Sequence, residues 1–310
     1  MEDKKEIMEL LQNKQTLERE LQILTYGSVE IRENDSSKYI YVHYREDGVA
    51  LTKYVGEYSD ELYNLVLNNS IKAKQLKKQI REITKKLKQL NYVEEELSET
   101  VEQNIDFAKR HLVDTIYKQA ILEGVATTFA DTESIIEGGK VNNMTSEDIL
   151  KIINLKHAWE FILNKNVILS NTNFALLCEI NKMVEEGFYY TAGKIRSVPV
   201  TIGGTKWKPD LPIESIIKEE LEVIFNKKLT DVDRAIELLL YTMKKQIFID
   251  GNKRTAVIYS NHYLISKGKG IIAIPAELTQ EFKDLLIPYY EGKDEKNIKQ
   301  FIREKCYIAI

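Results

Sequence analysis

The chain of 310 residues is poor in cysteine, proline and glycine, and each scarcity excludes something. Its two cysteines, Cys178 and Cys306, lie far apart, so the sequence predicts neither a disulfide framework nor a cysteine-based zinc site. Only 5 prolines and 14 glycines are available to interrupt helices. A mainly helical chain with few long loops is therefore expected.

Long apolar runs and an excess of positive charge are also missing. No run of about 18 apolar residues occurs, so no membrane span or membrane partner is expected. The first six residues are mostly charged and lack the apolar stretch of a signal peptide, which predicts a cytoplasmic protein. The net charge is −4, so nucleic acid is not an expected partner.

The first third of the chain has the pattern of a helical hairpin. Residues 3–25 and 59–90 read as helices, and the second has apolar residues at heptad spacing (Leu76, Ile80, Ile83, Leu87 and Leu90). Between them, residues 39–44 and 49–55 alternate like strands around a turn at 46–48, which predicts a β-hairpin at the tip. We expect residues 1–96 to form an accessory module.

Two features of this module have alternative interpretations. The lysine-rich face of residues 72–88 is typical of a solvated coiled-coil flank, which is the favoured interpretation, or of a nucleic-acid contact. The tyrosines at 39, 41 and 44 suit cross-strand packing or, less commonly, a binding surface.

Helices dominate the predicted structure of residues 97–310. They are expected at 97–123, 146–163, 173–187, 214–225, 231–243, 255–267, 277–290 and 294–306. A short helix at 131–138 would be capped by Asp131 or Thr132 and ended by Gly138. Glu137 lies in its last turn, where the helix dipole disfavours an acid, which suggests a partner elsewhere. Residues 198–208 alternate around Gly203-Gly204 and predict a small β-hairpin, whose free edge suits an extended peptide.

The densest group of site-type residues is the loop at 246–256, between two apolar helical segments. Asp250-Gly251 is a turn signal, and Asn252 is a plausible N-cap of the next helix. The first amides of a helix and its dipole favour anions, and Lys253 and Arg254 add positive charge there. The loop therefore predicts a phosphate-binding site, although a string of this kind taken alone is also typical of an ordinary turn.

Three separated segments together resemble the Fic/Doc family. Residues 246–255 resemble its motif, His-Pro-Phe-x-Asp/Glu-Gly-Asn-Gly-Arg in Fic and His-x-Phe-x-x-Ala-Asn-Lys-Arg in Doc. Residues 192–204 resemble the Fic flap hairpin, and residues 134–138 resemble the inhibitory helix of many Fic proteins. The resemblance implies a Fic-like helical bundle over residues 97–310, with an inhibitory-like helix at 131–138, a flap at 192–209 and a motif loop at 246–256.

The resemblance also implies roles for single residues. Phe248 would anchor the loop, Asp250 would hold Mg²⁺, and Gly251, Asn252, Lys253 and Arg254 would bind the phosphates of ATP. The flap edge at Thr201, Ile202 and Gly203 would align a target protein by β-augmentation, and Glu137 would be regulatory.

The sequence departs from the family pattern at three positions of the motif. Gln246 stands where the family has the histidine general base, and an amide cannot accept a proton at neutral pH. Lys253 matches Doc, whereas AMP-transferring members usually have glycine. Val257 replaces a second arginine that would contact the terminal phosphate and pair with the inhibitory glutamate, so Glu137 lacks that partner.

Three functional hypotheses follow from the matches and the departures. The first is a transferase that moves AMP from ATP to a hydroxyl of a target protein, impaired by Gln246. The second is a Doc-like phosphotransferase of the toxin–antitoxin type, and the third is an inactive Fic fold that binds nucleotide or a partner protein. Homo-oligomer formation is left open.

Overall fold

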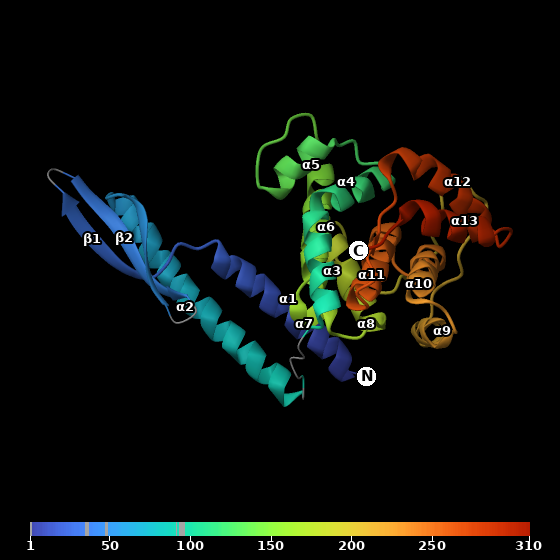
Figure 1. Ribbon diagram of the computed structural model, residues 1–310, viewed down its shortest axis with the longest axis horizontal. Coiled ribbons are helices and arrows are strands. Elements are labelled where there is room, and N and C mark those ends of the chain that lie inside the picture. Colours follow the sequence, from blue (N-terminus) through green and yellow to red (C-terminus); the bar gives the residue numbers. More distant parts are fainter. Residues whose placement is uncertain (1, 35–36, 47–48, 91, 93–96) are drawn as a thin grey trace. The chain divides into compact units, whose positions relative to one another are not determined.

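The computed structural model describes residues 2–34, 37–46, 49–90, 92 and 97–310. It divides into two compact units, Met1–Val93 and Glu94–Ile310 (Figure 1). Helices predominate, which confirms the mainly helical fold class. Residues 47–48 of the predicted turn at 46–48, and residues 93–96 next to the predicted boundary at 96/97, lie outside the described residues.

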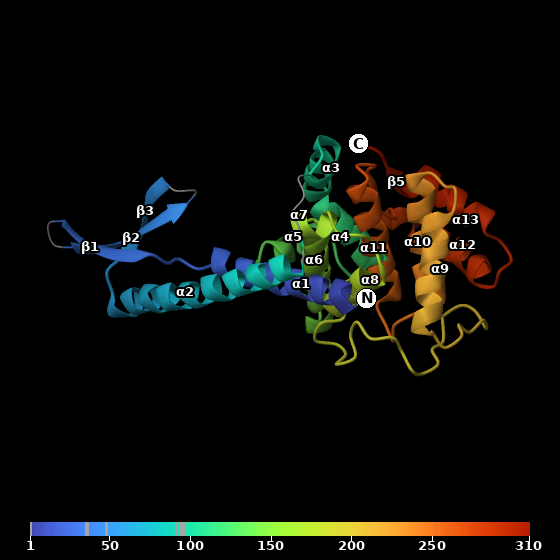
Figure 2. The same cartoon turned by 90° about the horizontal axis from the view of Figure 1, so that it is seen from below.

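Unit 1 is built on two long helices that pack side by side, α1 (Glu2–Gln22) and α2 (Asp60–Gln89) (Figures 1 and 2). The Ser59 side chain caps α2 by accepting a hydrogen bond from the Leu62 amide at 3.1 Å. Buried residues of both helices form the apolar seam, namely Met8, Leu10, Leu11, Val66, Ala73, Leu76 and Leu87. The predicted helical hairpin is confirmed.

An antiparallel sheet of three strands joins these helices, in the order β1 (Ser28–Asn34), β2 (Ser37–Glu46), β3 (Val49–Glu57). The sequence predicted only the last two strands, because β1 offers only two apolar residues among charged ones. Ile40 and Val42 are buried. Tyr39 and Tyr41 contact Tyr54 across the strands, with ring centroids 6.1 and 5.5 Å apart, as in the packing interpretation.

Unit 2 is a helical bundle around one central helix, α11 (Asn252–Ser266), which packs against α3, α6, α7, α8, α10 and β4. Every residue of α11 from Arg254 to Ile265 is buried. Its other elements are α3 (Glu99–Arg110), α4 (Leu112–Leu122), α5 (Phe129–Ile136), α6 (Ser146–Ile162), α7 (Lys165–Ile168), α8 (Phe174–Val184), α9 (Glu214–Asn226), α10 (Asp231–Lys245), β4 (Ile271–Ile272), η1 (Ala276–Leu278), α12 (Thr279–Tyr290), α13 (Lys296–Phe301), η2 (Ile302–Cys306) and β5 (Tyr307–Ile308).

The structure corrects three local predictions in this unit. The helix expected at 97–123 is broken at His111, whose backbone leaves helical geometry (φ −98°, ψ 8°). Helix α5 is capped by Thr128, not by Asp131 or Thr132, because the Thr128 hydroxyl accepts the Asp131 amide hydrogen bond. No strand forms among residues 192–209, so the predicted flap pairing is wrong.

The helices of the described part of the chain do not combine the length and the apolar content that a membrane crossing needs.

Candidate active site

The motif loop connects the end of α10 to the start of α11. Gln246 ends α10 in the left-handed region (φ 49°, ψ 58°), and Gly251 has φ 70° just before α11. Phe248 is buried, as expected for the anchor of the loop. A residue other than glycine in the left-handed region is uncommon and carries backbone strain. The turn at 246 therefore depends on contacts that hold it.

Asn252 supplies two of these contacts from inside the loop. Its side-chain Oδ1 accepts a hydrogen bond from the Phe248 amide at 3.0 Å, and its Nδ2 donates to the Phe248 carbonyl at 2.9 Å. The prediction that Asn252 is the N-cap is wrong, since Gly251 occupies that position and Asn252 is the first residue of the helix. Its side chain clamps the loop instead of capping the helix.

Two further polar side chains hold the loop from outside. Asn181 of α8 donates to the Asp250 carbonyl and to the Thr255 hydroxyl, both at 3.1 Å. Arg196 donates from Nε to the Gln246 carbonyl at 2.6 Å, and its amide donates to the Ile247 carbonyl at 3.0 Å. Both side chains are at least 95% buried. The loop is therefore fixed by hydrogen bonds from two other segments before any ligand binds.

Arg254 lies at the meeting point of three helix ends. Its guanidinium is 2.8 Å from Glu185 Oε1 at the C-cap of α8 and 3.5 Å from Glu123 Oε2 at the C-cap of α4. Asp250 Oδ1 is 3.7 Å away, and Lys253 Nζ is 3.4 Å from Glu123. The Arg254 side chain is only 3% exposed. Its charge is thus already balanced within the protein.

Glu185 is the most perturbed acid of this cluster. Burial raises its pKa to about 7, although Arg254 opposes the shift, and Asp250 and Glu123 add to it. A Cβ on Gly251 would lie 2.3 Å from Glu185 Oε1, so only glycine leaves room for the carboxylate. Among the described residues, neither Glu185 carboxylate oxygen accepts a hydrogen bond, and Arg254 Nε finds no acceptor. The ion pair is close, but its hydrogen bonds are poorly aligned.

These residues fit nucleotide phosphates together with Mg²⁺. The Asp250 side chain is 53% exposed, and Mg²⁺ is usually held by one or two carboxylates plus substrate phosphates. No group of three or more His, Cys, Asp or Glu among the described residues forms a metal site alone, so the ligand would complete it. Lys253, whose side chain is 33% exposed, and the first amides of α11 are donors suited to phosphate oxygens.

The site lacks a general base at its first motif position. Gln246 Nε2 donates to the Met243 carbonyl at 2.7 Å, and its Oε1 accepts from Asn252 at 3.3 Å. His262 does not substitute for it, because it is fully buried and lies ten residues along α11, about 15 Å from the loop. Its nitrogens are 2.8 Å from the Thr172 hydroxyl and the Val167 carbonyl, and burial lowers its pKa to about 4.

The predicted flap is an irregular segment held at both ends. Arg196 donates to the carbonyls of Val198 and Asp210, and Trp207 stacks on Tyr290 with centroids 5.8 Å apart. Thr201 and Gly203 are exposed and Ile202 is half-buried. The assignment of these three residues to target binding stays a prediction, and they form no strand that could pair with a target segment.

Glu137 is the C-cap of α5 and is exposed, with no ion pair among the described residues. Val257, at the second-arginine position, is buried in the core. The inhibitory role assigned to Glu137 stays a prediction, and it lacks the partner that the family provides.

Reasoning from the sequence missed Glu123 and Glu185, which the structure brings to Arg254. Both stand at helix C-caps shortly before a glycine, where the dipole disfavours an acid. Glu137 shows the same misfit in the sequence, so an acid at the C-terminal end of a helix was a usable signal of a partner elsewhere. It could not say which of these acids has the partner.

Comparisons with known proteins agree with this geometry. Residues 171–264 match the model of the Fic/DOC family. The chain resembles Fic-1 from C. elegans (TM-score 0.52, 17% identity, 79% of this chain and 77% of that chain). It also resembles a Fic domain containing signaling protein from Bacteroides thetaiotaomicron (TM-score 0.53, 18% identity, 67% of this chain and 85% of that chain). A third similar structure is a Fic family protein from Desulfovibrio desulfuricans (TM-score 0.52, 13% identity, 67% of this chain and 72% of that chain). A search of curated proteins gave no match. The chain therefore has the fold of the Fic domain proteins, and its residues 171–264 match the Fic/DOC family model.

Proposed function

We propose that unit 2 is a nucleotide-dependent transferase that uses ATP and Mg²⁺ to transfer AMP to a hydroxyl of a target protein, slowly because of Gln246. The observation that carries the proposal is the fixed loop, which presents Asp250, Lys253 and the N-terminus of α11 beside the buried Arg254. A purely structural remnant would have no need of such donors.

Charge supports a requirement for Mg²⁺ in this proposal. The cluster around Arg254 holds three carboxylates, Glu123, Glu185 and Asp250, against two cations. A triphosphate would add further negative charge. Mg²⁺ bound with the phosphates would neutralise that charge and polarise the phosphoryl oxygens. Lys253 and Arg254 would hold phosphate oxygens, and Asn252, Asn181 and Arg196 would keep the loop in position.

Two alternatives each rest on a specific observation. Lys253, paired with Glu123 at 3.4 Å, and the buried Val257 favour a Doc-like phosphotransferase. The hydrogen-bonded amide of Gln246, which cannot accept a proton, favours a domain that binds nucleotide or a partner without transfer.

Labelled ATP distinguishes the three functions. The protein is incubated with Mg²⁺, a cell lysate and ATP labelled at the α or the γ phosphate. We expect label from the α phosphate on protein, which indicates AMP transfer. Label from the γ phosphate alone would indicate phosphotransfer instead. Nucleotide binding without label would support the binding domain. Absence of nucleotide binding would overturn both transfer reactions and leave only the partner-binding form of the third function.

A further inference from the structure

The strongest charge asymmetry in the chain lies on α2, in unit 1. Residues 71–90 contain eight cations and one acid, a net charge of +7, although the whole chain carries −4. All eight cations are exposed. Unit 1 therefore presents a positive surface that the overall composition conceals.

The structure resolves this charge into a single stripe. At 100° per residue, six of the cations fall within a sector of about 100°, and no other residue between 74 and 88 enters that sector. The stripe consists of Lys74, Lys77, Lys78, Arg81, Lys85 and Lys88. It runs for about 21 Å along α2, on the side away from the buried Ala73, Leu76 and Leu87.

An ordinary solvated helix face does not explain this arrangement. Such faces mix both signs at spacings of three and four residues, whereas like charges at those spacings destabilise a helix. Among the described residues, the only ion pair of the stripe is Lys78–Glu82 at 4.0 Å, and Lys77 lies over the Tyr26 ring at 4.6 Å. The helix dipole favours Lys88 in the last turn, but not the stripe residues further from the C-terminus, such as Lys74, Lys77 and Arg81.

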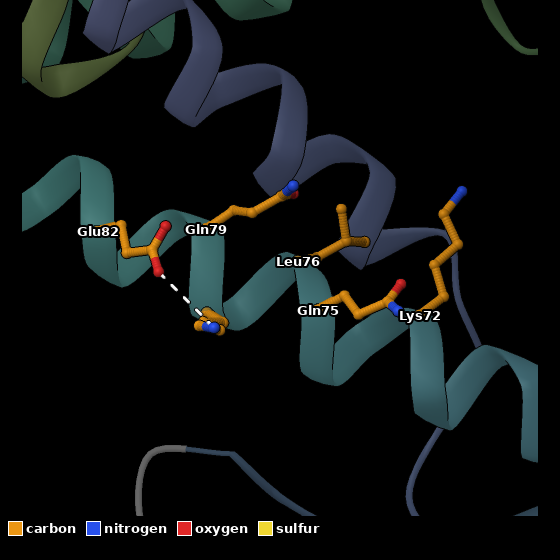
Figure 3. Close-up of a pocket in the computed structure, with 6 residues that line it drawn as sticks. Lys72, Gln75, Leu76, Gln79 and Glu82 are labelled. Carbon is orange, nitrogen blue, oxygen red and sulfur yellow. Dashed lines mark ion pairs between the residues drawn. The ribbon is translucent and has the colours of Figure 1, made fainter.

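The neighbouring groove between the stripe and α1 has a different character. It has a volume of about 480 Å³ and is lined by Lys72, Gln75, Leu76, Lys78, Gln79 and Glu82 (Figure 3). Its mixed polar lining, with Lys72 paired to Glu20 at 3.0 Å, gives no strong attraction for a polyanion. The exposed stripe, not the groove, is the candidate surface.

We propose that the stripe from Lys74 to Lys88 binds the phosphate backbone of a nucleic acid. A straight row of cations matches the regular row of like charges on a nucleic-acid strand, and no base-reading residues are needed. A membrane surface fits less well, because the apolar face of α2 is packed against α1 and is not free to enter lipid. An acidic protein fits less well because its surface charges are rarely so regular.

Binding of the full chain to fluorescein-labelled 20-mers, single-stranded and duplex, tests this proposal by anisotropy across a salt series. We expect log K to fall with log salt with a slope of about −4 for single strands or about −5 for duplex, as for six neutralised phosphates. The triple variant Lys77→Glu, Arg81→Glu, Lys85→Glu should weaken binding at least about tenfold and reduce the slope by about half.

The matched control has the same change in net charge outside the stripe, with Lys228, Lys296 and Lys305, all exposed, changed to Glu. It should bind as the wild type does. If the reversed stripe disturbs folding by circular dichroism, Gln at the same three positions replaces it, since Gln keeps helix propensity.

Three results would overturn the proposal. They are no binding to either 20-mer, equal loss of binding in the stripe and control variants, and equal or tighter binding to polyglutamate or to phosphatidylserine vesicles. The proposal does not specify a single strand or a duplex. Binding to either probe therefore supports it.

Discussion

Gln246 occupies a backbone position that would suit the histidine it replaces. Its φ of 49° lies in the left-handed region, where histidine is several-fold enriched over most residues. Its amide already makes two hydrogen bonds, to Met243 and Asn252, so the position is ordered. A base introduced here would therefore be held beside the proposed nucleotide site.

The variant Gln246→His should increase protein labelling from ATP by about 10²–10⁴-fold, the usual effect of general-base catalysis. Labelling with Mg²⁺ and α-labelled ATP measures it. Gln246→Asn is the control, since asparagine tolerates the same backbone but accepts no proton, and it should stay at the wild-type level. Unchanged labelling by a folded Gln246→His protein would show that 246 is not the base position.

Arg254 is expected to stabilise the fold as well as to bind phosphate. Arg254→Met would leave Glu185 buried without its ion-pair partner and Glu123 with Lys253 alone, which costs about 3–5 kcal/mol. Urea unfolding without nucleotide measures this loss. Lys253→Met, at a partly exposed neighbour, should cost less than about 1 kcal/mol. Equal costs for the two variants would contradict the structural role of Arg254.

His262 makes stability depend on pH. Burial lowers its pKa from 6.5 to about 4, so the unfolded chain binds the proton more readily. Its contribution is complete above pH 6.5 and is lost as the pH falls towards 4, by about 3 kcal/mol. Unfolding free energies measured between pH 4 and 7 check this. His262→Gln should lack this component of the slope, and an identical slope in both proteins would refute it.

At the scale of elements, the flap depends on one side chain. Arg196 bonds to carbonyls at both ends of residues 198–210 and to the motif loop, and burial lowers its pKa. Residues 198–210 form no β-ladder, so hydrogen bonds from the Arg196 guanidinium stand in place of the strand pairing of a hairpin. Lysine cannot reach several carbonyls in this geometry.

We predict that Arg196→Lys lowers the unfolding free energy by about 2 kcal/mol, since hydrogen bonds to a charged group are lost. Limited proteolysis should then cut residues 197–211 faster. The control is Lys194→Arg, an exposed position two residues earlier, which should leave both measurements unchanged. Equal protection of the segment in both variants would show that Arg196 does not hold the flap.

Periodicity predicted most elements because burial follows it. Helices α2 and α10 appear where apolar spacing placed them, whereas α11, buried on every side, was predicted as an apolar segment. The errors lie where local signals compete. The flap has β-type alternation, but Trp207 packs on Tyr290 and Thr205 bonds to Glu291 of the following turn, and these contacts favour an irregular path.

At the scale of the whole molecule, the two compact units divide the proposed functions. The cluster around Arg254 draws residues only from α4, α8, the loop and α11, all in Glu94–Ile310. The cationic stripe lies entirely in Met1–Val93. The contacts described for each site come from residues of a single unit.

A fragment of residues 97–310 should therefore fold and bind nucleotide as the full chain does. Its thermal midpoint should stay within about 3 °C of that of the Glu94–Ile310 transition in the full chain, since a change of 1 kcal/mol shifts a domain of this size by about 2–4 °C. Calorimetry and nucleotide titration measure both properties. A fragment that is unfolded, or that loses nucleotide affinity, would show that unit 1 completes unit 2.

The sequence alone determined the helical class and the heptad seam of unit 1, because apolar spacing is a local property, and its resemblance to the Fic/Doc motif identified the loop at 246–256. Only the tertiary structure decided how the charges are used. It paired Arg254 with Glu123 and Glu185 from two distant helix ends and left Glu137 exposed. Pairing depends on which helix ends meet in space, and no local pattern specifies that.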